Sequence, residues 1–129
     1  RDFKEVRELY VSEKLSDEEL AEGLQPEEVL VKVCLTDHAY RRMVNTYGRE
    51  YTWEDVLDLI HEKGHLLFTK KNRSEFAIKN DRNTLALYCK MYYYRGEIVL
   101  VLKTVVRKVI YVDGFEVEQE VYLGDTEWI

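Results

Sequence analysis

The chain has few of the residues that break regular structure or cross-link it. Its 129 residues include one proline, six glycines and two cysteines, and no apolar run approaches the roughly 18 residues that span a bilayer. So little proline and glycine excludes a fibrous or linker-rich protein, and two cysteines make no disulfide framework. We expect one compact domain over residues 1–129, cytoplasmic, without a membrane partner and with Cys34 and Cys89 reduced.

Positive charge is scarce outside the middle of the chain. Residues 1–62 carry 8 basic and 16 acidic side chains, residues 63–110 carry 11 and 3, and residues 111–129 carry none and 6. The total of −6 disfavours a general nucleic-acid-binding protein. The basic middle is compatible with an anionic partner on one surface. It is equally compatible with a basic sheet edge that the acidic tail neutralises.

The amino-terminal part of the chain carries mostly helix signals. Apolar residues at helical spacing predict an amphipathic helix over residues 2–14, and a capping box of Ser16 and Glu19 predicts a short second helix. Residues 29–35 then alternate as a strand with one buried face does. Residues 1–35 are therefore predicted to be an acidic helical extension followed by the first strand.

Two more helices and then a sheet are predicted to follow. One helix runs from Thr36 or Asp37 to Gly48, and the next begins after Thr52 and ends at Gly64. Beyond Gly64 the period is two. This period predicts strands over residues 65–70, 74–79, 85–94, 97–112 and 115–123, the fourth of them bent near residues 106–108.

Two tight turns predict how the last strands pair. Arg95-Gly96 and Asp113-Gly114 have the composition of hairpin turns, so the strands that flank them are expected to be antiparallel neighbours. The expected fold class is α+β, with amino-terminal helices packed on a carboxy-terminal antiparallel sheet. Residues 36–123 form the helix–helix–sheet core of this single domain.

The first hairpin predicts an aromatic and basic face. Counting back from its turn pairs Tyr88 with Lys103 and places Thr104 on the buried face. The opposite face would present Tyr88, Lys90, Tyr92, Tyr94, Lys103 and Arg107. Such a face can stack unpaired bases of RNA, or bind a protein, since tyrosine and arginine dominate protein interfaces. Glutamates of the last strand are expected beside these cations, which favours a protein.

A His-Glu-x-x-His sequence from His61 to His65 has the spacing of a zinc hydrolase site. That chemistry needs both imidazoles on one helix, and Gly64 stands where the helix should end. Lys63 adds a positive charge near the would-be cation, and no third ligand stands at the usual distance. A zinc hydrolase is therefore the least favoured function, and we expect no metal and no cofactor.

His38 is a candidate for proton transfer. It lies in the first turn of the helix that begins at Thr36 or Asp37, and Arg42 stands four residues later on the same face. A helix amino terminus disfavours imidazolium, so His38 would stay neutral and able to accept a proton. The guanidinium beside it suits a phosphate. A capping or packing role for this histidine is the alternative.

Residues 36–107 resemble the small phage and toxin–antitoxin proteins with a His-Ala-x-x-Arg motif, which belong to the metal-independent ribonuclease superfamily typified by barnase, EndoU and RelE. The matching segments are His38-Ala39-Tyr40-Arg41-Arg42-Met43, then Trp53-Glu54-Asp55-Val56-Leu57 through Gly64, then residues 98–105. Proteins of this group fold as two helices followed by an antiparallel sheet. Many proteins of this shape are binding modules without activity.

The resemblance also implies roles for single residues. It implies a general acid or base at His38, a phosphate contact at Arg42 and a polar strand residue, Thr104, near the scissile group. A basic residue on an earlier strand usually assists, and Lys79 is the first candidate, with Lys103 second. The implied reaction is metal-independent cleavage of RNA by attack of a ribose 2′-hydroxyl.

Two classes of function account best for these patterns. The favoured one is a small protein-binding module, such as a phage-encoded inhibitor or an immunity-type factor, whose partner is another protein. The alternative is a metal-independent endoribonuclease, whose partner is RNA. The acidic amino-terminal segment would suit a basic target protein.

Overall fold

The computed structural model describes residue 3, residues 5–45 and residues 51–129. The predicted end of the third helix at Gly48 lies outside the described residues. The elements follow in the order β1 (Glu5–Ser12), α1 (Asp17–Ala21), β2 (Glu28–Leu35), α2 (Asp37–Asn45), α3 (Trp53–Lys63), the 3-10 helix η1 (Gly64–Thr69), β3 (Glu75–Lys79), β4 (Leu85–Tyr94), β5 (Glu97–Val112) and β6 (Phe115–Gln119).

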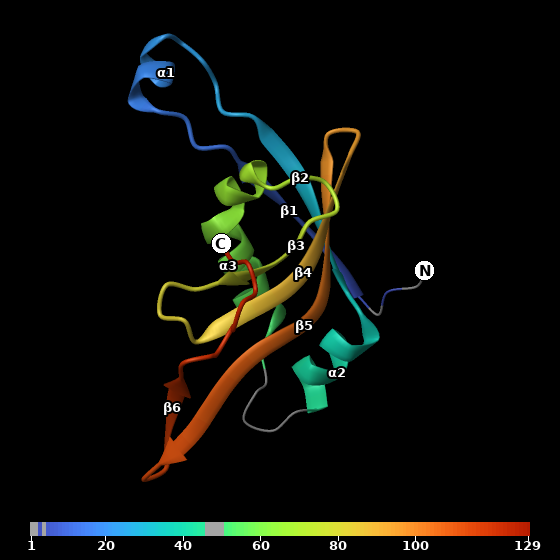
Figure 1. Cartoon of the computed structure of the whole chain (residues 1–129), viewed down its shortest axis with the longest axis vertical. Helices are drawn as coiled ribbons and strands as arrows, with labels where there is room; N and C mark the ends of the chain where they lie inside the picture. The colour runs from blue at the N-terminus through green and yellow to red at the C-terminus, as the bar shows by residue number, and fades with distance from the viewer. Residues whose placement is uncertain (1–2, 4, 46–50) are drawn as a thin grey trace.

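One mixed sheet organises the molecule. The strand order is β1-β2-β5-β4-β3, and β6 pairs with the far part of β5 as a hairpin. Strand β2 runs parallel to β5, whereas the other neighbours are antiparallel. Figure 1 shows the β1–α1–β2 excursion at one end of the long axis and the β5–β6 hairpin at the other. The predicted arrangement of amino-terminal helices on a carboxy-terminal antiparallel sheet is therefore wrong.

The first correction concerns residues 2–14, which were predicted as a helix and contain strand β1. Leu9 and Val11 face the core and Val6 and Tyr10 face outward, so the same apolar residues satisfy the alternation of a strand. Pairing with β2 along its whole length decides between the two periods. Tertiary pairing overrides local spacing here, because the eight-residue strand pairs with β2 and packs Leu9 and Val11 against the core.

The second correction concerns residues 65–70, predicted as a strand and found as η1, which continues α3. A short apolar run has the same appearance in a strand and in a buried helical turn. Leu67 is buried in the core, and Gly64 lets the turn approach β1 closely. A Cβ atom built on Gly64 would lie 2.5 Å from Cγ1 of Val11, so only glycine fits this contact.

The locally coded features were predicted correctly. Both capping boxes are present, Ser16 with Glu19 at α1 and Thr52 with Asp55 at α3. Strand β2 matches its prediction, and β4 and β5 have the predicted bounds. The turn residues Arg95, Gly96, Asp113 and Gly114 all have positive φ, from 50° to 83°, as two-residue hairpin turns require. Strand β6 is shorter than predicted.

A β-bulge changes the register between β4 and β5. Tyr94 to Lys90 pair as predicted, but Cys89 pairs with Leu102 and Tyr88 with Thr104, so Lys103 is the extra residue. A one-residue insertion moves every later side chain to the other face. Thr104 therefore shares a face with Tyr88. The prediction that Thr104 lies on the core face is wrong. Arg107 was predicted on the Tyr88 face, and it lies on the opposite face, beside Leu85.

The core lies between one face of the sheet and the helices α3 and η1, with α2 packed at one end. Its fully buried centre includes Val31, Leu35, Ile60, Leu67, Phe76, Ile78, Leu87, Leu100 and Leu102. The outer face of the sheet is the face on which Lys32, Val99 and Tyr92 lie in one row. Among the described residues, no helix is long and apolar enough to cross a membrane.

Candidate functional site

The outer face carries part of the predicted tyrosine and lysine set. Tyr88, Lys90 and Tyr92 are half-buried there, and the Lys90 ammonium lies 5.5 Å from the centre of the Tyr92 ring. Tyr94 ends the same strand and is 66% exposed, with the Arg95 guanidinium 5.1 Å from its ring. Four of the six predicted binding residues therefore lie in one row along β4.

Two cations of this face have carboxylate partners. Lys103 forms an ion pair with Glu75, and Lys32 lies 3.4 Å from a carboxylate oxygen of Glu97. Both pairs lie at half-exposed positions, so each contributes little to stability. Their effect on recognition is larger, because a neutralised face attracts a nucleic-acid backbone weakly.

Arg107, the sixth member of the predicted face, lies elsewhere. After the bulge it reaches the hairpin, where its guanidinium lies 3.3 Å from Glu118, and Arg82 lies 3.4 Å from the same carboxylate. A hydrogen bond from Thr84, together with these cations, holds the pKa of Glu118 below its ordinary value. Arg107 thus fastens the β5–β6 hairpin to the sheet and does not extend the Tyr88 face.

His38 and Arg42 lie on α2, whose start is fastened to β5. The Thr36 hydroxyl accepts a hydrogen bond from the Ala39 amide at 3.2 Å and donates one to the Lys103 carbonyl oxygen at 3.1 Å. Nε of Arg42 donates to the Val105 carbonyl oxygen at 3.3 Å. His38 is exposed. The helix therefore holds an exposed imidazole and an anchored guanidinium one turn apart.

Tyr51 supports this end of α2. Its hydroxyl donates to the Ala39 carbonyl oxygen. Burial raises the pKa of Tyr51 to about 12, an effect that the positive charge of Arg42 partly offsets. The phenol therefore stays protonated and able to donate at neutral pH.

The other two predicted catalytic residues lie apart from His38. Lys79 is on β3, separated from β5 by β4, and its ammonium stacks 4.2 Å from the ring centre of Trp128. Thr104 faces outward beside Tyr88, whereas α2 packs on the core through Ala39. The structure thus brings together His38 and Arg42 but not the full predicted set of four.

The two histidines of the zinc motif stand on different kinds of helix. His61 is exposed in the last turn of α3, and His65 is half-buried in η1. Within residues 5–45 and 51–129, no cluster of three histidine, cysteine or acidic side chains is arranged to hold a metal ion. The geometry therefore offers no observation that favours zinc hydrolysis.

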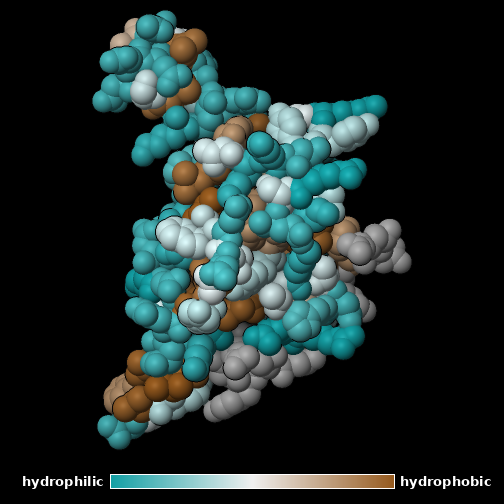
Figure 2. Space-filling model, in the orientation of Figure 1, coloured by the Kyte–Doolittle hydropathy of each residue, from teal (hydrophilic) through white to brown (hydrophobic). Residues whose placement is uncertain are grey.

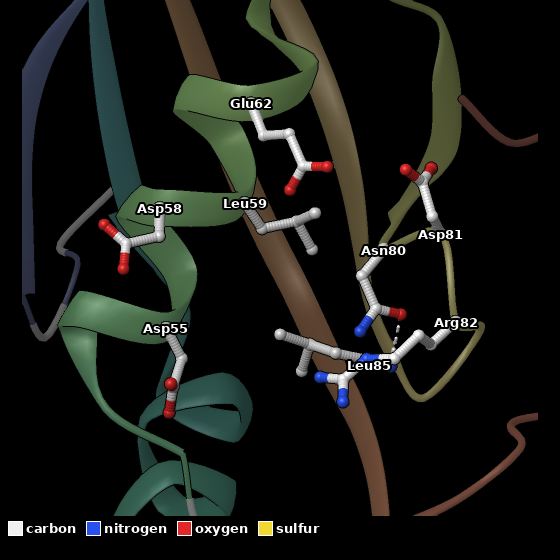
Figure 3. A pocket seen from close by; sticks show the side chains of 8 residues that line it. All are labelled: Asp55, Asp58, Leu59, Glu62, Asn80, Asp81, Arg82 and Leu85. Carbon is white, nitrogen blue, oxygen red and sulfur yellow. Dashed lines mark hydrogen bonds between the residues drawn. The ribbon is translucent and has the colours of Figure 1, made fainter.

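A shallow hollow of about 270 Å³ opens between α3 and the β3–β4 loop. Figure 3 shows carboxylates of Asp55, Asp58 and Glu62 spread along the helix, with Asp81 across from them on the loop. Asp55 caps α3 by accepting from the Thr52 amide at 2.9 Å, and Asp81 accepts from the Lys63 ammonium at 2.8 Å. The ion pair lowers the pKa of Asp81. These carboxylates are structural or solvated, and they do not converge on a ligand.

Neither cysteine is an activated nucleophile. Both are free and buried, Cys89 against the core and Cys34 on the outer face beside Val101. Burial raises the pKa of Cys89 to about 12 and raises the pKa of Cys34 as well. Since the thiolate is the reactive form, both thiols are chemically quiet at neutral pH.

One exposed apolar surface was missed in the sequence. We define the hairpin face as Ile110, Val112, Phe115 and Val117, which lie on one side of the β5–β6 hairpin because Ile110 pairs with Val117 and Val112 with Phe115. They are between 39% and 75% exposed, and Figure 2 shows apolar atoms gathered at that end. The alternating apolar residues on both sides of Asp113-Gly114 were the available signal.

No family model, curated protein or solved structure matches this chain.

Proposed function

We propose that the protein is a protein-binding module, of the inhibitor or immunity type, that inserts its hairpin face into an apolar groove of another protein. The observation that carries this proposal is the exposure of Ile110, Val112, Phe115 and Val117 on one side of a projecting hairpin. Contiguous apolar surface that stays exposed on a folded chain is typical of an interaction site.

The construction of the hairpin supports this role. A two-stranded ribbon is only marginally stable by itself, and this one is braced on its other side by the ion pairs of Glu118 with Arg107 and Arg82. The apolar side chains are therefore presented on a fixed support. A preordered surface loses less conformational entropy on binding.

Charge on the outer face of the sheet favours a protein over RNA. Lys103 and Lys32 are paired with Glu75 and Glu97. The whole chain carries a net charge of −6, which repels a phosphate backbone at long range. The tyrosines of that face remain available as a second contact region for the same protein partner.

A matched pair of variants on the hairpin tests the proposal. Phe115 and Tyr111 lie on opposite faces of the same hairpin, so Phe115→Ser is the test and Tyr111→Ser is its control. Each variant and the wild type are immobilised and exposed to an extract of the native cell or its host. We expect a protein that the wild type and Tyr111→Ser retain and that Phe115→Ser loses. Retention by all three forms would contradict the role of the hairpin face. A fourth form, Tyr92→Ala, tests the outer face of the sheet. If this form alone fails to retain the protein, the contact lies on that face and not on the hairpin face.

The second candidate function is a metal-independent endoribonuclease, which the anchored Arg42 beside the exposed His38 supports. A general acid or base is typically worth about 10²–10⁴ in rate. If the chain cleaves RNA, His38→Ala abolishes cleavage and leaves stability within about 1 kcal/mol, because an exposed side chain packs little. Arg42→Ala weakens RNA binding in a salt-dependent way. Cleavage that survives His38→Ala would eliminate this mechanism.

A further inference from the structure

Strand β1 is an open edge of the sheet. It pairs with β2 through a regular register in which Glu5 lies opposite Leu35 and Ser12 opposite Glu28. Among the described residues, no strand pairs with its other side. An open edge offers backbone donors and acceptors to another strand.

The register shows which residues offer them. The Glu13 amide donates to the Glu27 carbonyl oxygen at 2.9 Å, so residue 13 points its backbone groups at the β2 side. Backbone direction alternates along a strand. Val6, Glu8, Tyr10 and Ser12 therefore direct their amide and carbonyl groups outward. Their side chains share the outer face of the sheet, where Val6 is 43% and Tyr10 is 60% exposed.

The sequence of this edge is complementary to itself when it is reversed. If a second copy pairs antiparallel about Tyr10, each Tyr10 lies opposite the other, and Glu8 lies opposite Ser12. Arg7 of each copy then lies opposite Glu13 of the other, which gives two reciprocal ion pairs on the helix-covered side. Centring the pair on Glu8 would oppose two carboxylates. Centring it on Val6 would leave Tyr10 to Ser12 largely unpaired.

The charged residues of the edge make contacts within their own chain. An Arg7 guanidinium nitrogen donates to the outward Val6 carbonyl oxygen at 3.2 Å, so pairing at the Val6 end of the strand must displace this contact. The guanidinium also stacks 5.1 Å from the Trp53 ring centre and lies 3.4 Å from Glu5. Glu13 uses Oε1 to accept from the Glu27 amide at 3.0 Å. Arg7 and Glu13 share one side of the strand by alternation, at the spacing that the reversed copy needs, and each exchanges its present contact for the intermolecular ion pair.

We infer that two copies of this chain associate through β1, antiparallel about Tyr10, into one continuous sheet with two-fold symmetry. Such a contact is isologous, since each patch meets its own copy. The contact covers one strand and little side-chain area, so the dimer is a weak one in the micromolar range. This inference does not rest on the hairpin face or on the proposed protein partner.

Charge reversal tests the register. Arg7→Glu opposes two carboxylates at each end of the pair, and we expect it to raise the dimer dissociation constant by about tenfold or more. The double variant Arg7→Glu with Glu13→Arg exchanges the charges and is expected to restore wild-type association. Sedimentation velocity over a concentration series measures each form, and circular dichroism checks that each is folded.

A tyrosine pair supplies the matched control. Tyr10→Lys opposes two ammonium groups at the dyad and is expected to give monomers, whereas Tyr122→Lys, at a position 92% exposed outside the strands, leaves the dimer intact. Hydrogen exchange of the outward amides of Glu8 and Tyr10 should slow as concentration rises.

Three outcomes would overturn the inference. The first is a wild-type chain that stays monomeric over the whole concentration series. The second is a double variant no better than Arg7→Glu, which would exclude the Tyr10 register. The third is a dimer that Phe115→Ser dissociates and Tyr10→Lys leaves intact, which would assign self-association to the hairpin.

Discussion

The two edges of the sheet are finished in different ways. At β3 the last residues of the chain lie alongside the strand, so the Ala77 and Lys79 amides donate to the carbonyl oxygens of Glu127 and Ile129 at 2.8 and 3.1 Å. The Ile129 amide donates back to Ala77 at 2.9 Å. At β1 the described chain supplies no such partner. One edge is closed from within, and the other is left for an intermolecular partner.

The two edges differ because only the segment that follows β6 packs beside an edge strand. After β6 the tail returns past the β3–β4 loop, where the Val121 amide donates to Asn83 at 2.8 Å, and buries Ile129 in the core. The connection between β1 and β2 instead forms the acidic helix α1, which has no buried residue. An edge is closed where an apolar side chain holds the covering segment in place.

The largest expected effect is the opening of the closed edge. Deletion of residues 127–129 removes three backbone hydrogen bonds, each worth about 1 kcal/mol, and the burial of Ile129, worth about 2 kcal/mol. We expect a loss of about 5 kcal/mol in the free energy of unfolding by urea. Trp128→Ala is the control, because that side chain is 56% exposed and its loss costs far less. Equal losses would mean that the tail acts through Trp128.

A smaller effect is expected at the open edge from Gly64→Ala. The added Cβ meets Cγ1 of Val11 at 2.5 Å, so η1 and β1 must separate. Overpacking of this kind costs about 1–3 kcal/mol. Combining it with Val11→Ala should recover part of the loss, which a double-mutant cycle measures in thermal unfolding. Additive losses would show that the contact is not the cause.

Trp53→Phe is expected to cost about 1 kcal/mol. The change removes the indole N–H that donates to Glu5 and keeps an aromatic ring beneath Arg7. Chemical unfolding at two salt concentrations measures the loss, and Glu5→Gln in the same background should add little. A loss as large as that of Gly64→Ala would mean that ring packing, and not the hydrogen bond, holds the edge.

The smallest effect is a pH dependence at the base of the β5–β6 hairpin, from which the tail continues to the closed edge. The pKa of Glu118 lies below its ordinary value of 4.5, first because of the hydrogen bond from Thr84. A lowered folded-state pKa gives stability that is complete above the unfolded value and is lost as pH falls through the folded value. We expect Glu118→Gln to lose less than about 1 kcal/mol at neutral pH. The difference from wild type should vanish in acid, and a constant difference would contradict the linkage.

The local features of the fold could be predicted because each depends on a few neighbouring residues. Ser16 with Glu19 and Thr52 with Asp55 satisfy helix amides within one turn. Gly96 and Gly114 follow residues that also adopt positive φ, so the two hairpins are encoded at their turns.

The candidate site could be predicted only in part. His38 and Arg42 share one helix, so their neighbourhood follows from spacing, as does the row of Tyr88, Lys90 and Tyr92 on one strand. Lys79 and Thr104 belong to other strands, and their places depend on strand order and on the bulge at Lys103. The hairpin face was encoded by alternation around Asp113-Gly114, but its exposure depends on the absence of a covering layer among the described residues.

The sequence by itself determined the caps, the two hairpins, the bounds of β4 and β5 and the charge of each region, because neighbouring residues suffice for these. Only the tertiary structure decided that β1 is a strand, that β2 runs parallel to β5, and that the last residues close one edge. These features join residues far apart in the chain, and their free energy comes from buried area and backbone pairing that no local pattern contains.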